Sequence, residues 1–186
     1  MPARDDITNV AAILVTIASL FAAISWISSG GAGSEASSSR MSALGFMMLR
    51  LECVTEASSS RVQAQSYLTQ AGMYLAYSEK EENLEVKAYL ENLWYQSIQL
   101  SNFYTEIAEN AEGRAVLYSD AYENAMSQTS LFDSISELRS TAALLFNVSA
   151  IIASCAVLFR KRFLLYIYLP SFVTGLYYLL SSAIAA

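Results

Sequence analysis

Three long apolar runs, interrupted by one long polar segment, set the pattern of the chain. The runs cover residues 10–27, 141–159 and 163–186, and none of them contains a charged side chain. Because about 20 apolar residues cross the ~30 Å hydrocarbon core of a bilayer as a helix, the pattern predicts three transmembrane helices. The first is expected to be a retained signal anchor, since the residues before it are not cationic and the run is longer than the core of a signal peptide.

The polar segment between the first two runs carries heptad patterns typical of long packed helices. Residues 35–78 are predicted to form one helix and residues 84–138 another, which we expect to continue into the second span. The charged stretch 79–83 between them contains no apolar residue and suits the tip of a hairpin. A folded four-helix bundle, with breaks near Gly72 and Gly113, is the alternative arrangement.

Each predicted helix has a seam of residues at heptad spacing. In the second helix, two tracks contain eleven apolar or aromatic residues among fourteen positions. Polar residues lie within both seams, which favours further partners, including other copies of the chain, over a plain two-stranded coil. The seam of the first helix is Leu44, Met47, Leu51, Val54, Ser58, Arg61, Gln65, Leu68 and Leu75. The tracks of the second are Leu93, Leu100, Ile107, Arg114, Ala121, Gln128 and Ile135, and Leu90, Ser97, Tyr104, Ala111, Tyr118, Ala125 and Phe132.

A short repeat lies within the first of these helices. The hexapeptide EASSSR occurs at 35–40 and again at 56–61, an offset of 21 residues, and Ala43 with Ala64 continues in step. Three heptads return to the same face of a supercoiled helix. The repeat therefore predicts equivalent structural positions, with chance similarity in a Ser- and Ala-rich segment as the alternative.

Glycines mark one expected domain boundary. The stretch 28–33 contains three glycines, and it is predicted to break the helix of the first span from the polar segment after it. The fold class predicted is an all-α membrane protein, with three transmembrane helices plus an extramembrane helical hairpin, coiled coil or small bundle between spans 1 and 2. The expected domains are an N-terminal signal-anchor span (1–29), an acidic extramembrane helical domain (30–140) and a C-terminal two-span helical hairpin (141–186).

Charge gives an orientation for these spans. Residues 34–140 hold 15 of the 17 acidic residues and 7 of the 11 basic ones, a net charge of −8. The one dense basic cluster is the turn 160–162, Arg-Lys-Arg, which the positive-inside rule places in the cytoplasm. The N-terminus is then cytoplasmic as well, and residues 30–140 and the C-terminus lie outside an inner or plasma membrane.

The third span contains a proline and four tyrosines that predict further structural features. Pro170 is expected to kink the helix, because proline removes a backbone hydrogen-bond donor. Tyrosines lie near both ends of the run and suit the aromatic belts of the two membrane interfaces. These tyrosines are Tyr166 and Tyr168 at one end and Tyr177 and Tyr178 at the other.

The composition excludes most catalytic chemistry. The chain contains no histidine, which is the commonest general acid or base and a frequent metal ligand. It has two distant cysteines, and it lacks a glycine-rich phosphate loop, HExxH and GxSxG. The net charge of −6 without a basic stripe argues against a nucleic-acid partner. We therefore predict no enzyme activity, no cofactor, and no catalytic or metal-ligating residue.

A few residues outside the spans are candidate sites. The acidic tip could bind Ca²⁺ through carboxylates, although its spacing is not that of an EF-hand and a solvated helix end is favoured. Asp133 and Glu137 lie one turn apart, which is more typical of surface charges. Cys53 is expected to be a small packed residue. Tyrosines and Trp94 could offer a recognition surface, with packing as the favoured use of most. The tip acids are Glu79, Glu81, Glu82 and Glu85, and the tyrosines are Tyr67, Tyr74, Tyr77, Tyr89, Tyr95, Tyr104, Tyr118 and Tyr122.

The spans contain polar and small residues but no ionisable acid or base. That absence argues against an active transporter, because such residues usually mark ion-coupled pathways. Cys155 is expected to be structural, with palmitoylation as a weak alternative. Three pairs with small-xxx-small spacing permit close helix contacts: Ala18 with Ala22, Ala150 with Ser154, and Ser171 with Gly175. The uncharged polar residues are Thr16, Ser19, Ser25, Asn147, Ser149, Ser154 and Thr174, which could line a pore but more often bond across helix contacts.

The layout resembles a bacterial family of uncharacterised membrane proteins with one N-terminal span, a helical middle and two C-terminal spans joined by a short basic turn. The matching stretches are RDDI at 4–7, TEAS at 55–58 and LFRKRFLLYIY at 158–168. The resemblance implies an architecture and no activity. Oxa1-type insertases share the order of elements, but their coiled coil is cytosolic and their bacterial members keep a cation in a membrane groove.

The function predicted is a non-enzymatic scaffold or accessory subunit that acts by helix packing in a homo-oligomer or a larger membrane complex. Its expected partners are the lipid bilayer and other membrane subunits or copies of itself. The alternative is a passive channel formed by several copies, and an insertase or chaperone ranks lower.

Overall fold

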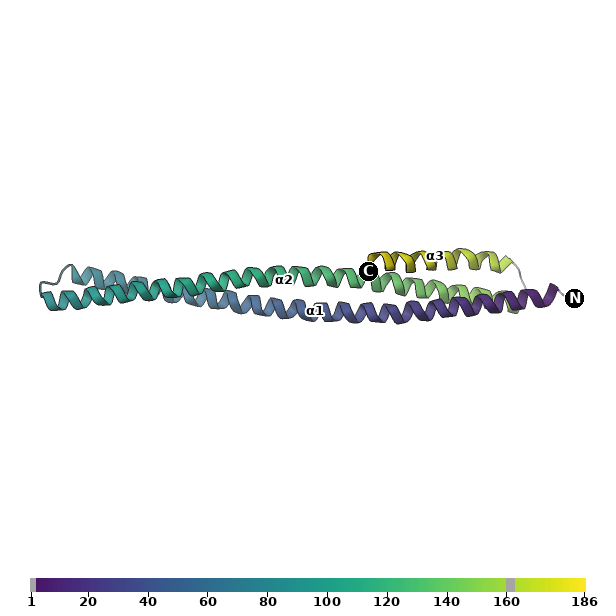
Figure 1. Cartoon of the computed structure of the whole chain (residues 1–186), viewed down its shortest axis with the longest axis horizontal. Coiled ribbons are helices and arrows are strands. Elements are labelled where there is room, and N and C mark those ends of the chain that lie inside the picture. The colour runs from purple at the N-terminus through teal and green to yellow at the C-terminus, as the bar shows by residue number, and fades with distance from the viewer. Residues whose placement is uncertain (1–2, 160–162) are drawn as a thin grey trace. The chain divides into compact units, whose positions relative to one another are not determined.

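The computed structural model describes residues 3–159 and 163–186, with side chains from residue 9 onward. This part of the chain forms three helices and no strand: α1 (Ala3–Ser78), α2 (Leu84–Phe159) and α3 (Phe163–Ala185) (Figure 1). Each of them contains a stretch that is long and apolar enough to cross a membrane. The all-α class with three candidate spans is therefore confirmed. The predicted basic turn at 160–162 lies outside the described residues.

The helices pack as two compact units. Unit 1 comprises Met1–Met41 with Ala125–Ala186, and unit 2 comprises Ser42–Asn124. Helices α1 and α2 each contribute to both units, whereas α3 belongs to unit 1. The three apolar runs thus lie in unit 1, and the predicted hairpin tip lies in unit 2.

Unit 2 is an antiparallel pair formed by the end of α1 and the start of α2 (Figure 1). The two helices are joined over residues 79–83, where the charged stretch predicted a turn. Helix α1 continues through Gly72 and α2 through Gly113. Unit 2 is therefore a hairpin of two unbroken helices, and the four-helix alternative is wrong.

Asn83 starts the return helix. Its side-chain Oδ1 accepts hydrogen bonds from the backbone N–H groups of Glu85 at 3.0 Å and Val86 at 3.4 Å. These donors have no partner within the helix, and an asparagine cap of this kind contributes about 1 kcal/mol to stability. The sharp restart of α2 after the turn follows from this cap.

The expected helix break at the glycines of 28–33 is wrong, because α1 passes through this stretch. Glycine in a helix costs about 1 kcal/mol relative to alanine, and contacts with α2 offset that cost here. Ser29 Oγ donates to the Ser136 carbonyl at 3.0 Å, and Ser136 Oγ donates to the Ser29 carbonyl at 3.2 Å. A Cβ on Gly33 would lie in ordinary van der Waals contact with Ser136 Oγ, at 3.7 Å. Small residues at this point let the two helices bond directly.

The seam predicted for α1 is also wrong. Leu51, in its middle, is 67% exposed, whereas Ala57 is only 3% exposed. Every fully buried side chain in unit 2 is an alanine, serine or cysteine. They are Ala43, Cys53, Ala57, Ser60, Ala64, Ala71 and Ser78 on α1, and Ser97, Ser101, Ala108, Ala111 and Ala115 on α2.

A close approach of the two backbones explains this choice of small residues. Ser101 Oγ on α2 donates to the backbone carbonyl of Ala64 on α1 at 3.0 Å. Helices separated by so little space cannot hold leucine or methionine between them, because interaxial distance follows the size of the side chains at the contact. The large apolar residues of α1 therefore lie outside the seam.

On α2 the sequence predicted one track correctly. The seven residues from Leu90 to Phe132 are all buried or half-buried. The parallel track is mixed: Ile135 is buried and three members are half-buried, whereas Leu100, Arg114 and Gln128 are exposed. One predicted track therefore marks the seam along its whole length, and the other marks its border.

The 21-residue repeat corresponds to equivalent structural positions. Ala36 and Ala57 are both buried. Arg40 pairs with Asp133 within unit 1, and Arg61 pairs with Glu112 within unit 2. The acidic partners are themselves 21 positions apart in the sequence. The two copies of the repeat therefore occupy the same seam position and form the same kind of flanking ion pair.

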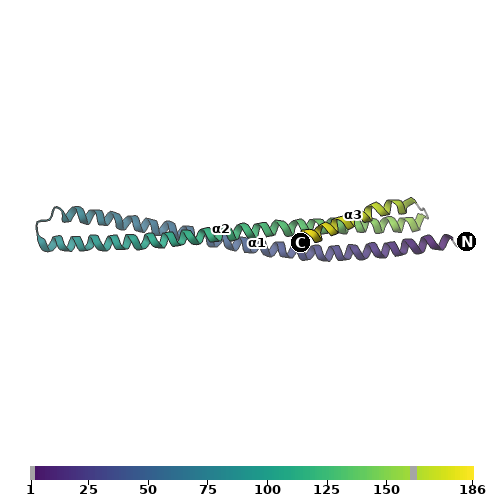
Figure 2. The ribbon, with the colours of Figure 1, turned by 45° about the horizontal axis from the view of Figure 1, so that its top comes forward.

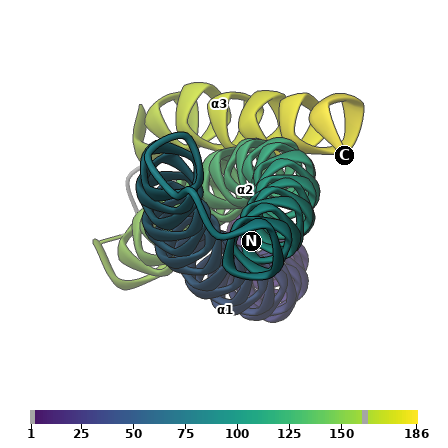
Figure 3. The same cartoon turned by 90° about the vertical axis from the view of Figure 1, so that its left-hand side faces the viewer.

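In unit 1, α3 crosses α2 obliquely (Figure 2; Figure 3). Phe172 of α3 lies 5.8 Å from Phe21 of α1 and 5.2 Å from Phe146 of α2, measured between ring centroids. The Phe146 ring leaves no space beside Gly175, where a Cβ would lie 3.0 Å from it. This aromatic cluster fixes all three helices to one another.

Candidate functional site

The seam of the unit 2 hairpin is flanked on both sides by ion pairs. Arg61 Nη2 lies 2.7 Å from Glu112 Oε1 on one side, and Arg114 Nη2 lies 2.6 Å from Glu56 Oε2 on the other. All four side chains are more than 40% exposed, and surface pairs of this kind contribute about 0.2–1 kcal/mol each. The pairs help to set the register of the two helices.

An apolar surface runs along α1 outside the seam, and we call it the outer stripe. It consists of the apolar residues of the predicted seam. The first four recur at spacings of three and four and therefore share one face of the helix. The last two lie 14 and 21 residues after Val54, beyond the polar seam residues, and return to the same face in heptad register. Each of these side chains is exposed in unit 2. The outer stripe is Leu44, Met47, Leu51, Val54, Leu68 and Leu75.

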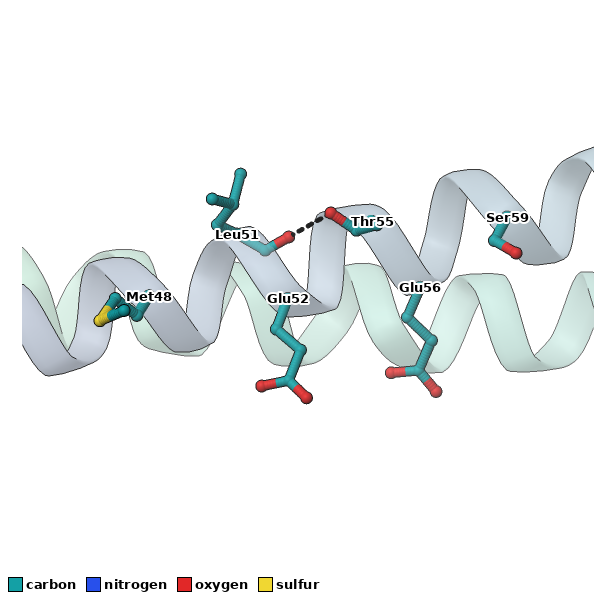
Figure 4. Close-up of a pocket in the computed structure, with 6 residues that line it drawn as sticks. All are labelled: Met48, Leu51, Glu52, Thr55, Glu56 and Ser59. Carbon is teal, nitrogen blue, oxygen red and sulfur yellow. Dashed lines mark hydrogen bonds between the residues drawn. The ribbon is translucent and has the colours of Figure 1, made fainter.

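A hollow on the surface of α1 lies beside the outer stripe (Figure 4). Leu51 and Met48 provide its apolar lining, and the Thr55 hydroxyl donates to the Leu51 carbonyl at 2.8 Å. Figure 4 shows Glu52 and Glu56 extending to the same side of the helix. The hollow thus combines exposed hydrocarbon with acidic groups, a composition that suits contact with another protein better than catalysis.

The carboxylates of the acidic tip are arranged around a helix start. Glu81 Oε1 accepts a hydrogen bond from the backbone N–H of Asn83 at 3.0 Å, which uses that carboxylate within the turn. Among the described residues, no three acidic or cysteine side chains gather closely enough to hold a metal ion. The tip carboxylates instead surround a capped helix start.

Asp133 and Glu137 do not act as a pair either. The Asp133 carboxylate is bound to the Arg40 guanidinium of α1. Glu137 is exposed, and its backbone carbonyl accepts a hydrogen bond from the Ser140 hydroxyl at 3.0 Å. The ion pair gives Asp133 a structural use.

The two cysteines lie in different settings. Cys53 is buried in the small-residue seam of unit 2, as predicted for a packed residue. Cys155 is half-buried in unit 1, and it lines a groove between α1 and α2.

The aromatic residues divide between packing and exposure. Tyr67 and Tyr104 stack across the unit 2 hairpin with ring centroids 5.6 Å apart, and Trp94 is half-buried. Tyr77, Tyr89 and Tyr95 are exposed. In α3, Tyr168 is buried, and its hydroxyl donates to the Leu14 carbonyl at 3.3 Å, so this side chain packs against α1.

Members of all three small-xxx-small pairs form contacts inside unit 1. Ala18 and Ala22 are both buried. Ser171 Oγ donates to the Leu145 carbonyl at 3.3 Å, and Gly175 lies against the Phe146 ring. Ala150 packs against the cluster that contains Ala18, and Ala150 and Ser154 also line the groove between α1 and α2.

Sequence reasoning missed Arg139, which ties the three helices of unit 1 together. Its Nη1 donates to the Ser28 carbonyl of α1 at 3.1 Å, and its Nε donates to Ser182 Oγ of α3 at 3.3 Å. A signal was present, because position 139 continues the correctly predicted α2 track seven residues after Phe132. A charged residue in an inward-facing track indicates a buried polar contact.

No protein-family model, curated protein or solved structure matches this chain. The resemblance to a bacterial membrane family therefore stays a prediction.

Proposed function

We propose that this chain is a non-enzymatic membrane scaffold or accessory subunit, which acts through helix packing in a homo-oligomer or a larger membrane complex. The observation that carries the proposal is the outer stripe of unit 2. Its six large apolar side chains are exposed at helical spacing, while the hairpin buries only alanine, serine and cysteine. Such a surface is typical of a helix that packs against a further helix.

Burial of the outer stripe by a partner is energetically favourable. Full burial of one leucine or methionine side chain is worth about 1.5–3 kcal/mol. Soluble surfaces rarely keep large contiguous apolar patches without a binding role. A partner that covers Leu44, Met47, Leu51 and Val54 would gain several such contributions from a short stretch of α1.

The positions of the charged residues support a structural role. Four of them form the ion pairs that flank the hairpin seam, and Arg40 and Asp133 form another. Charges used to join helices are not free to act as general acids, bases or nucleophiles. This use of the charges fits a scaffold better than an enzyme.

We further propose the orientation that the basic turn 160–162 favours. In it, this turn and the N-terminus face the cytoplasm, and the acidic hairpin lies outside an inner or plasma membrane. The net charge of −8 over residues 34–140 suits an aqueous domain outside the bilayer. The outer stripe would then meet its partner in water above the membrane.

The mass of the native assembly tests the proposal. After gentle detergent extraction without overexpression, we expect a mass well above that of the 20.4 kDa chain. Replacing Leu44 and Leu51 together by serine should lower this mass, because it removes the apolar face. Thr55→Ser is the matched control and should leave the mass unchanged. A native protein that runs as a single chain would contradict the proposal.

A further inference from the structure

A groove in unit 1 lies between α1 and α2 within the candidate spans. Val15 and Ser19 line it from α1, and Asn147, Ala150, Ile151 and Ser154 line it from α2. Every one of these residues belongs to an uncharged apolar run. The groove therefore faces the hydrocarbon core wherever the two helices cross a bilayer.

Asn147 and Ser19 are the unusual members of this lining. Both side chains are exposed, and neither has a hydrogen-bond partner among the described residues. The other hydroxyls nearby bond to carbonyls of their own helix: Thr16 to Ala12 at 2.9 Å, Ser149 to Leu145 and Ser154 to Ala150, both at 2.8 Å. An amide and a hydroxyl are thus left unpaired in the same groove.

An unpaired amide is costly in a bilayer. The hydrocarbon core contains no water to bond the exposed N–H and C=O groups, and each unsatisfied polar group costs several kcal/mol. Polar side chains of membrane helices accordingly bond across helix contacts. Ser19 shares the lining but forms no hydrogen bond with Asn147, so the amide needs a further partner that brings both a donor and an acceptor to the middle of the span.

The small residues beside Asn147 permit close approach of another helix. Ala18, Ala22, Ser171 and Gly175 form contacts inside unit 1. In the remaining small-xxx-small pair, Ala150 packs against the buried cluster of Ala18, Ala153 and Tyr168, and Ser154 is exposed; both residues line the groove. The exposed Ser154 and the unpaired amide therefore lie on the same face of α2, with only the small side chain of Ala150 between them.

We propose that a second copy of this chain docks in the groove, with the two Asn147 amides hydrogen-bonded across a two-fold axis. A primary amide is self-complementary, because its NH₂ group donates and its carbonyl accepts. Copies inserted with the same orientation are related by an axis normal to the membrane, which brings identical residues together at the same depth. This inference rests on the proposed function and identifies the partner at one of its surfaces.

Cys155 provides the test, because it lines the same groove. The purified full-length chain with Cys53→Ala keeps Cys155 as its one thiol, and it is reconstituted in phosphatidylcholine vesicles at high lipid-to-protein ratio. Oxidation with copper-phenanthroline should yield a disulfide-linked dimer through Cys155. A control chain has Cys53→Ala, Cys155→Ala and Ile13→Cys, which places the thiol on an exposed position of α1 outside the groove lining. We expect little dimer from this control.

Substitutions at Asn147 test whether the dimer depends on the amide hydrogen bond or only on the closeness of the two copies. Asn147→Leu should raise the dissociation constant of the dimer by about 3- to 30-fold, the range expected for one interhelical polar contact. Asn147→Gln keeps the amide and should retain most of the cross-linking. Absence of a Cys155 dimer, equal cross-linking of the Ile13→Cys control, or no effect of Asn147→Leu would each overturn the inference.

The test also separates this inference from the proposed function. A large native mass that depends on the outer stripe, combined with no Cys155 dimer, would leave the scaffold in place and remove the groove as its interface. The opposite result is a Cys155 dimer combined with a native mass that does not change when Leu44 and Leu51 are replaced by serine. It would support the groove as an interface and count against the outer stripe of unit 2. The two claims therefore fail on different measurements.

Discussion

Replacing Ala57 by leucine should destabilise the unit 2 hairpin by about 1–3 kcal/mol, the usual cost of overpacking a well-packed contact. Ala57 is 3% exposed, in a seam where only small side chains are buried. A leucine there must push the helices apart, which also strains the neighbouring ion pair of Glu56 with Arg114. Urea unfolding of the full chain in mild detergent, followed by circular dichroism, measures the change.

Leu51→Ala is the control for this experiment. Leu51 is 67% exposed and lies outside the seam, so its truncation should change the unfolding free energy by less than about 0.5 kcal/mol. The measurement is made at low protein concentration, so that assembly does not contribute. If Leu51→Ala were the more damaging substitution, the seam would be the one that large apolar residues predict and not the one described.

Gly175→Leu should detach α3 from α2 and lower the thermal midpoint of the full chain in detergent. A Cβ at this position would lie 3.0–3.3 Å from three atoms of the Phe146 ring. That ring is fully buried and also contacts Phe21 and Phe172, so it has little room to move. We expect a loss of at least about 1–3 kcal/mol from overpacking.

Gly113 offers a comparison with the opposite expected sign. It lies inside α2, and a Cβ there would meet no atom within 4 Å. Gly113→Ala should therefore stabilise the chain by about 1 kcal/mol through helix propensity alone, whereas Gly175→Ala should not. Equal stabilisation by both alanine variants would contradict the close contact between α3 and the Phe146 ring.

The spans and the hairpin could be predicted because both depend on long-range composition. An uncharged run near 20 residues has few alternatives to a membrane helix, and the charged stretch 79–83 separates two periodic segments. The glycines of 28–33 misled the prediction, because propensity is a local preference that tertiary contacts override. The reciprocal bonds between Ser29 and Ser136 lie 107 residues apart in the sequence, which no local rule detects.

The seam of α1 could not be found by looking for large apolar residues. Helix α1 carries two heptad tracks side by side, one of small residues around Ala57 and one of large residues around Leu51. Hydrophobicity ranks leucine above alanine, but closely packed antiparallel backbones select for size instead. Alanine at 43, 57, 64 and 71, all multiples of seven apart, is the signal that would have identified the seam.

The residues of the candidate surfaces could be named from the sequence, but their surroundings could not. The residues of the outer stripe were named from the sequence, but as a buried seam and not as an exposed face. Asn147 was named among the polar residues of the spans, although its unpaired amide and its groove depend on how α1 and α2 meet. Arg139 was missed, because its two partners come from other helices.

The accessibility of position 51 in native membranes tests the central claim most directly. In a chain carrying Cys53→Ala, Cys155→Ala and Leu51→Cys, a water-soluble maleimide reports whether the outer stripe is covered. Freeze–thawed vesicles give the reagent access to both sides, and Glu85→Cys at the exposed start of α2 is the reference. We expect labelling at 51 to be at least about tenfold slower than at 85, because a bound helix excludes the reagent, and to become fast once detergent dissociates the assembly. Equal rates at the two positions in the membrane would show the stripe uncovered and would contradict the scaffold.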